Sequence, residues 1–225
     1  ACRGAGIKPI GAADVWIGNP NAPDKPFRAM LIIRNDAGYL RLSELLTEAY
    51  VGKDRNIHHT ELNPEWLENG DNSGLICLSG AHYGEVGVNL LNGNEDAARA
   101  AALKYAAWFP DAFYLELQRL PERPEWEACV SGSVKLAEEL GLPVVATHPT
   151  QFMSRDDFNA HEARVCIAGG WVLTDKKRPR DFTPSQFFIP PETMAERFAD
   201  LPEALENTVE IAKRCNLHIT LGKNF

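Results

Sequence analysis

Residues 142–168, which read LPVVATHPTQFMSRDDFNAHEARVCIA, contain a passage from a strand to a helix on which the interpretation of the whole chain depends. The apolar letters VVA are typical of a short buried strand. Pro149 lacks an N–H and disfavours helical angles at the residue before it, so the run ends there. Ser154, followed by two aspartates, predicts a helix start, because oxygen acceptors and acidic groups are favoured at a helix N-terminus. Loops at the carboxyl ends of strands bear the chemistry of α/β barrels, so a site is expected here.

Strand-like runs and helical patterns alternate on both sides of this passage, which predicts a mostly parallel sheet covered by helices. Strands are expected at residues 7–17, 27–33, 74–79, 113–117, 144–146 and 218–221. Helices are expected at residues 35–50, 64–68, 85–91, 96–108 and 124–140, from 154 onward, and as a pair within 191–216. Between the last strand-to-helix unit and that pair, residues 169–191 contain several large apolar side chains and are expected to form an ordered, extended surface segment.

Composition limits the classes of protein that the chain can represent. Its 225 residues can bury a substantial core, and 44% hydrophobic with 24% charged residues is typical of a globular protein. The net charge of −8 argues against an autonomous nucleic-acid binder. No apolar stretch approaches membrane-spanning length and no signal peptide is evident, so we expect no membrane association and a cytoplasmic location.

Five cysteines are spaced too widely for a zinc ribbon, and their number is odd, so no disulfide framework is indicated. We expect those in apolar surroundings to be buried reduced thiols, namely Cys77, Cys129 and Cys166.

Several long motifs resemble one known family. They read VVAT-HPTQF, DDFNAHEARVCIAGG, DKKRPR and FADLPEALENTVEIAKRCNL, preceded by GIKPIGAADVW, RNDAGYLRLSELLTEAY and GLICLSG. In this order and spacing they are similar to the PHP (polymerase and histidinol phosphatase) domain of bacterial DNA polymerase III alpha subunits. The resemblance implies an α/β fold, a distorted (β/α)7 barrel of TIM-like type. It also implies that the barrel is N-terminally incomplete here, because the family's opening strand-helix units, with their histidine pair and Asp-His motif, are not found. We expect one PHP domain fragment over 1–225, with barrel units at 1–170 and a basic, extended segment plus C-terminal helices at 171–225.

Active members of this family hold up to three metal ions on His, Asp, Glu and Cys ligands and use them to activate water. By the resemblance, this chain keeps one such ligand, Asp14, and has lost four others. The replaced positions are Arg28, Ala81, Pro149 and Gln151. An arginine has no lone pair for a metal, so we predict a degenerate site with no bound metal and no catalytic residue. We further predict that Arg28 pairs with Asp14 from the adjacent strand.

Two histidines near the replaced positions are weak candidates for metal ligands. His82 follows Ala81 at a strand end, and His148 precedes Pro149. Elsewhere, the basic run of Lys176, Lys177, Arg178 and Arg180 is a candidate contact surface for nucleic acid. The favoured alternative is a loop that packs on an acidic surface or on the rest of the polymerase, because the run is single and has no aromatic stacking face.

The resemblance implies a parent enzyme that extends DNA from dNTPs with magnesium, through carboxylates that lie beyond residue 225. It implies for this fragment no enzymatic activity and no cofactor of its own, but a scaffold role. Its expected partners are the rest of the alpha subunit, the proofreading exonuclease subunit, and DNA through the parent enzyme. The alternative is a metal-dependent phosphoesterase or 3′–5′ exonuclease on the same fold, which the lost ligands disfavour. A free-standing metabolic enzyme on an α/β barrel is disfavoured by the motifs KRPR and ALENTVEIAKRCN.

Overall fold

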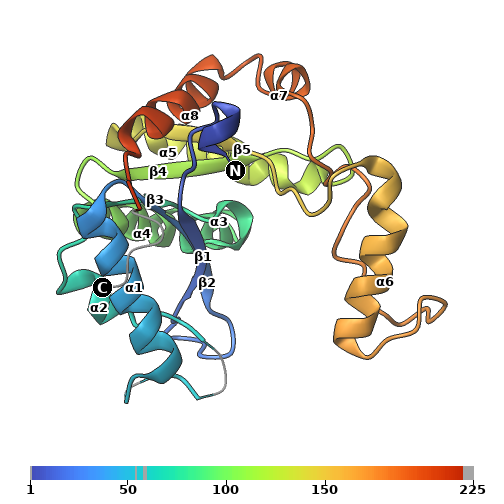
Figure 1. Cartoon of the computed structure of the whole chain (residues 1–225), viewed down its shortest axis with the longest axis horizontal. Helices are drawn as coiled ribbons and strands as arrows, with labels where there is room; N and C mark the ends of the chain where they lie inside the picture. Colours follow the sequence, from blue (N-terminus) through green and yellow to red (C-terminus); the bar gives the residue numbers. More distant parts are fainter. Residues whose placement is uncertain (1, 54, 58–59, 220–225) are drawn as a thin grey trace.

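A five-stranded sheet of order β1-β2-β3-β4-β5 forms the centre of the computed structural model, which describes residues 2–53, 55–57 and 60–219 (Figure 1). The strands are β1 Ala12–Ile17, β2 Phe27–Ile33, β3 Leu75–Leu78, β4 Phe113–Gln118 and β5 Val144–Thr147. These bounds follow the predicted strands closely, except that β1 starts five residues after residue 7. Pro9, which has no N–H for a ladder, lies in that shortened part.

The prediction of a mostly parallel sheet is wrong for its first half. β3, β4 and β5 run parallel, but β1 and β2 are antiparallel, and so are β2 and β3. A short turn joins β1 to β2, and such a turn can connect only antiparallel neighbours. The longer connection from β2 to β3 brings the chain back beside the end of β2, where the N–H of Arg34 donates to the carbonyl of Gly74. In the described residues the sheet is not closed into a barrel, and β1 and β5 are its two edges.

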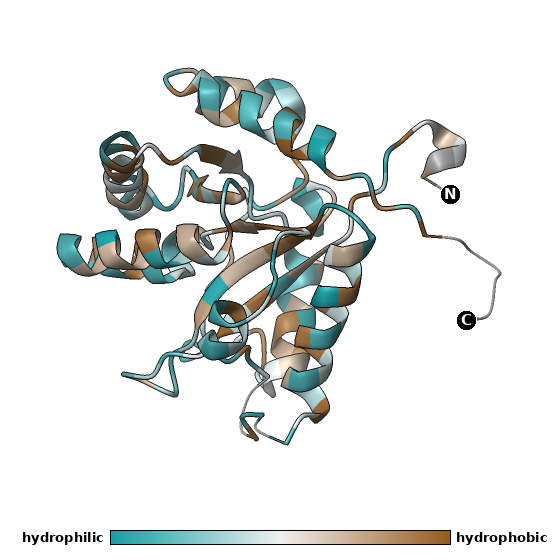
Figure 2. Cartoon of the chain, turned by 90° about the vertical axis from the view of Figure 1, so that its left-hand side faces the viewer, coloured by the Kyte–Doolittle hydropathy of each residue, from teal (hydrophilic) through white to brown (hydrophobic). Residues whose placement is uncertain are grey.

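Helices flank this sheet, and the strands carry many hydrophobic residues, drawn in brown in Figure 2. Buried apolar residues of the strands and helices form the main core cluster. α5 packs against β4 and β5, α8 packs against β5, α1 packs against β2, and α3 packs against α4 and α5. The helices are α1 Asp36–Val51, α2 Pro64–Glu68, α3 Glu85–Leu91, α4 Glu95–Trp108, α5 Glu127–Leu140, α6 Phe158–Gly169, α7 Pro191–Arg197 and α8 Pro202–Arg214. Short 3-10 turns lie at η1 Arg3–Ala5, η2 Ala81–Tyr83, η3 Pro124–Trp126 and η4 Arg155–Asp157. Every residue of β3 and β4 is buried, which explains the unbroken apolar run of β3; β4 is apolar apart from Glu116 and Gln118.

Residues 150–188, here called the α6 arm, extend away from the sheet and its helices (Figure 1). The expected helix start is confirmed, since Ser154 and Asp157 form a capping box at η4, just before α6. The extended segment after α6 returns along its start, with a bridge between Phe152 and Phe187. The ring of His161 packs between Phe152 and Phe182, at centroid distances of 5.2 and 4.6 Å. The arm therefore has a small core of its own.

Three further expectations have structural outcomes. Cys77, Cys129 and Cys166 are buried free thiols, as predicted. The strand expected at 218–221 is absent at 218–219, and its last two residues lie outside the described part of the chain. Among the described residues, none of the helices combines the length and the apolar character needed to cross a lipid bilayer.

Candidate functional site

The sheet brings several polar side chains together at one end of its strands. β1, β3, β4 and β5 run toward this end, and the antiparallel β2 starts from it. In the register, Asp14 lies opposite Met30, two residues from Arg28. Residues two apart on a strand share a face, so Asp14 and Arg28 are diagonal neighbours on the same face.

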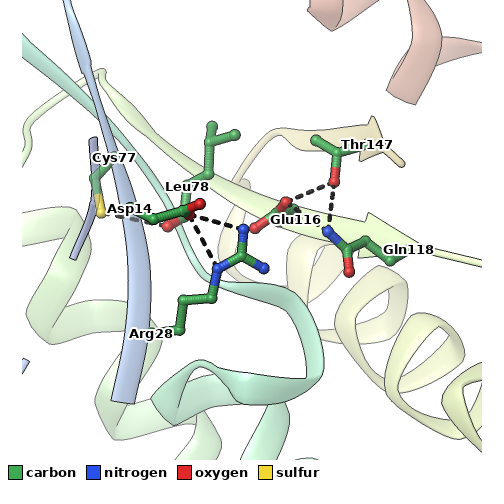
Figure 3. Close-up of polar contacts among 7 residues, drawn as sticks. All are labelled: Asp14, Arg28, Cys77, Leu78, Glu116, Gln118 and Thr147. Carbon is green, nitrogen blue, oxygen red and sulfur yellow. Dashed lines mark hydrogen bonds and ion pairs between the residues drawn. The ribbon is translucent and has the colours of Figure 1, made fainter. Parts of the chain in front are cut away.

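The Asp14–Arg28 pair predicted from the sequence is present in the structure (Figure 3). Both Nε and Nη2 of Arg28 donate to Oδ1 of Asp14, at 3.0 and 2.7 Å. The Arg28 side chain is 18% exposed and that of Asp14 is 56% exposed, so water reaches the carboxylate more than the guanidinium. A permanent positive charge thus occupies the side of Asp14 that a metal ion would need.

A second carboxylate, Glu116, lies on β4, which β3 separates from β2, and it is fully buried. Oε1 of Glu116 accepts hydrogen bonds from Nε2 of Gln118, at 3.0 Å, and from Oγ1 of Thr147, at 2.5 Å (Figure 3). Its other oxygen, Oε2, has no hydrogen-bond partner among the described residues. Burial raises the pKa of Glu116, and the nearby charge of Arg28 acts in the opposite direction. Arg28 therefore faces two carboxylates, of which only Asp14 is bonded to it.

The turn after β3 explains why the backbone approaches Arg28 so closely. Gly80 has φ +80, and a Cβ there would lie 2.0 Å from the carbonyl oxygen of Arg28. Only glycine fits such a position. The next residue, Ala81, is buried, and its methyl group offers nothing to a metal.

His82, a weak metal candidate from the sequence, lies near this centre and is buried. Its ring stacks on Trp126, with centroids 3.6 Å apart and planes at 23°. Burial, together with the charges of Arg28 and Arg123, lowers its pKa to about 4. Neither ring nitrogen has a hydrogen-bond partner in the described part of the chain. The imidazole is therefore neutral at pH 7 and packs as an aromatic ring.

The other weak candidate, His148, is engaged through both of its nitrogens. Nη1 of Arg197 lies 3.2 Å from Nδ1, and Nε2 lies 2.9 Å from the carbonyl oxygen of Phe187. An arginine can only donate, so Nδ1 accepts and Nε2–H donates. With both nitrogens bonded, His148 has no lone pair left for a metal, which argues against its candidacy.

Pro149 and Gln151 lie at the base of the α6 arm. The carbonyl of Pro149 accepts from Nε2 of Gln186 at 3.2 Å, and the N–H of Gln151 donates to the carbonyl of Gln186 at 2.8 Å. These two former ligand positions therefore connect the strand end to the extended segment of the arm.

The structure divides the basic run into buried and exposed members. Nη1 of Arg178 lies 2.5 Å from Oε2 of Glu162, and the two side chains are only 8% and 6% exposed. Arg178 therefore cannot belong to a contact surface, and its assignment to one is corrected here. Lys176, Lys177 and Arg180 are exposed. Arg178 is thus held by an acidic side chain of the same arm.

The side chains at this end of the sheet do not fit a metal ion. Among the described residues, no three His, Cys, Asp or Glu side chains are grouped so that they could hold one. The two carboxylates present, Asp14 and Glu116, face a guanidinium that would repel a cation. The site supplies fixed charges and hydrogen bonds, and no step of metal chemistry can be derived from it.

Sequence reasoning missed the network of Glu116, Gln118 and Thr147. The signal was the letters FYLELQ, because a glutamate and a glutamine two apart in an apolar strand point to the same face. The alternation of apolar and polar residues at 113–117 predicts a strand, but it assigns no role to the polar ones.

Comparisons with known proteins agree with this geometry. The family model described as PHP domain matches residues 1–120. The chain is 97% identical, over all its 225 residues, to the DNA polymerase III subunit alpha of Neisseria meningitidis serogroup A, of which it covers 20%. It is 46% identical over 223 residues to the subunit of the same name from Pseudomonas fluorescens and 43% identical over 225 residues to that from Escherichia coli K12, covering 19% of each. The chain thus spans about a fifth of the length of these curated relatives.

Proposed function

Because this chain belongs to the PHP domain family, we propose that it is a structural module of a bacterial replicative DNA polymerase alpha subunit, in which fixed protein charge replaces the family's metal centre. The single observation that carries the proposal is the guanidinium of Arg28, bonded through two nitrogens to Asp14. It sits where the family resemblance places a metal ligand. It neutralises the retained carboxylate without the need for an ion.

The activity that we propose for the parent protein is that of the relatives' name, the synthesis of DNA. In this proposal the parent extends DNA from dNTPs with two magnesium ions held by carboxylates outside this chain. The present chain contributes no catalytic group. It braces the polymerase, offers a surface to the proofreading exonuclease subunit, meets DNA only through the parent enzyme, and works in the cytoplasm.

We also propose that the open sheet belongs to a distorted (β/α)7 barrel. β1 and β5 are edge strands in the described residues, and a barrel removes such edges by pairing them with further strands. The division into barrel units at 1–170 and a second part at 171–225 stays a prediction. The end of α6 at Gly169 supports it, whereas the bridge between Phe152 and Phe187 ties the two parts together.

A metal-dependent phosphoesterase or 3′–5′ exonuclease remains the second candidate. One observation favours it: within the described ranges of the chain, Oε2 of Glu116 and both ring nitrogens of His82 are buried without hydrogen-bond partners. Such atoms are the kind that bind an ion. Two further lost ligand positions, Pro149 and Gln151, weigh against it, because their backbones are used to hold the α6 arm.

Elemental analysis combined with a hydrolysis assay tests the proposal. The purified chain, dialysed against buffer without chelator, is expected to hold no stoichiometric zinc, manganese or iron, and to hydrolyse no chromogenic phosphate ester. It is also expected to extend no primer by itself. One metal per chain, together with ester hydrolysis that Asp14→Ala abolishes and Lys135→Ala at a distant exposed ion pair leaves intact, would establish the hydrolase instead.

A further inference from the structure

The end of the α6 arm exposes a cluster of large apolar side chains, here called the tip patch. It consists of Ile167, Trp171, Val172 and Leu173, which are 83%, 40%, 67% and 47% exposed. All four lie between residues 167 and 173, at the end of α6 and in the turn after it, so they are grouped at one end of the arm. Single exposed apolar residues are ordinary, but a contiguous group marks an interaction site.

The tip patch is held in place by the interior of the arm. Gly170 ends α6 with φ +69, and the N–H of Trp171 donates to the carbonyl of Cys166 at 2.8 Å. Nε of Arg178 donates to the carbonyl of Leu173 at 3.2 Å, and the same guanidinium forms the buried pair with Glu162. An exposed surface that is already ordered loses little entropy when it binds. The ion pair therefore presents the patch in a fixed shape.

The surroundings of the tip patch are positively charged, although the chain as a whole is acidic. Residues 162–180 contain five cationic side chains (Arg164, Lys176, Lys177, Arg178, Arg180) and two acidic ones (Glu162, Asp175). Their net charge is 5 − 2 = +3, against −8 for the whole chain. A partner that covers the apolar residues would gain from acidic groups at its rim.

We propose that the tip patch docks onto an acidic, apolar-faced protein surface in the remainder of the polymerase subunit. This inference rests on the proposed function, since it takes the chain to work within a longer polypeptide. The relatives supply that length: the chain covers 20% of the Neisseria subunit. A surface on the same polypeptide meets the arm at a high effective concentration, so even a modest patch can hold it.

Nucleic acid is a poorer fit for the same surface. Binding sites for single strands combine basic groups with several aromatic platforms. The tip has one aromatic ring, Trp171, which lies over Gly169. The other members of the patch, Ile167, Val172 and Leu173, are aliphatic and cannot stack on bases.

Photo-cross-linking in the full-length subunit tests the proposal. A photoreactive amino acid is placed at Val172, and the same residue is placed at Ile57 as a control, because Ile57 is 78% exposed and lies outside the arm. We expect cross-links from 172 to a peptide beyond residue 225 that is rich in Asp and Glu. Their yield should exceed that from 57 by about tenfold and should not depend on protein concentration, as for an intramolecular contact.

Charge reversal supplies the second readout. Lys176→Glu combined with Lys177→Glu should lower the yield about tenfold, and Lys53→Glu should leave it unchanged. A yield from 172 no higher than from 57 would overturn the proposal. So would cross-links that join two copies, reach only another protein or reach nucleic acid. If the subunit extends primers and its PHP region is free of metal, yet no tip cross-link forms, the docking fails and the proposed function stands. A metal-loaded, hydrolytic PHP region would refute the proposed function whatever the cross-links show.

Discussion

Replacing Asp14 or Arg28 should destabilise the fold, and the two replacements should have unequal costs. The changes are Asp14→Asn and Arg28→Met, made singly and together. Breaking a deeply buried ion pair costs ~3–5 kcal/mol. Asp14 is 56% exposed, so water already solvates much of its carboxylate and the ion pair with Arg28 contributes little. Asp14→Asn should therefore cost roughly 0.5–1 kcal/mol.

Loss of Arg28 should cost more, because that guanidinium also opposes the burial penalty of Glu116. The cost of Arg28→Met should therefore lie between the roughly 0.5–1 kcal/mol of Asp14→Asn and the ~3–5 kcal/mol of a deeply buried pair. The double variant should be close to Arg28→Met alone. The coupling free energy between the two residues is then about 0.5–1 kcal/mol.

The pH dependence of Arg28→Met gives an independent check. Glu116 has a raised pKa in the folded state, so the folded chain holds its proton more tightly than the unfolded chain. Stability is therefore lost as the pH rises from the unfolded pKa through the folded one. Arg28→Met should extend this loss to higher pH, and Glu116→Gln in the same background should abolish the extension.

Urea unfolding at pH 7, followed by tryptophan fluorescence, measures these free energies. The exposed pair Lys135–Glu95, with an N–O distance of 3.1 Å, is the matched control and should show a coupling near zero. Additivity of Asp14→Asn and Arg28→Met within ~0.3 kcal/mol would refute the reasoning. Equal costs for the two single variants would do so as well, because they would mean that Glu116 does not sense Arg28.

Two further predictions concern buried ionisable groups. Glu162→Ala or Arg178→Met alone should destabilise the chain by ~3–5 kcal/mol, because both side chains are under a tenth exposed and the remaining charge would be buried without its partner. The double variant Glu162→Leu with Arg178→Met should cost far less. Urea unfolding measures these costs, and equal losses in all three variants would contradict the prediction. His82, with a folded pKa of about 4, should reduce stability as the pH falls from ~6.5 toward 4, because the unfolded chain takes up the proton first; an NMR titration midpoint near 6.5 in the folded chain would disprove this.

Much of the local structure was predictable because it depends on neighbours in the sequence. The strand at 27–33 and the helices at 64–68 and 85–91 have the predicted bounds, and Ser154 caps the helix start as expected. The pairing of Asp14 with Arg28 was also predictable, because consecutive strands are usually neighbours and the family resemblance places both residues at one centre.

What the sequence by itself determined is most of the elements and the family, since these depend on residue type and order. The tertiary structure decided which side chains contact one another around the candidate site. Strand direction was not predictable, because a long connection can bring the chain back at either end of the preceding strand. Here the connection after β2 enters β3 beside the end of β2, so the two strands are antiparallel. The roles of Glu116 and Arg178 were hidden for the same physical reason. The surroundings of each include a charged group many residues away, Arg28 for one and Glu162 for the other, and only folding brings such groups within reach.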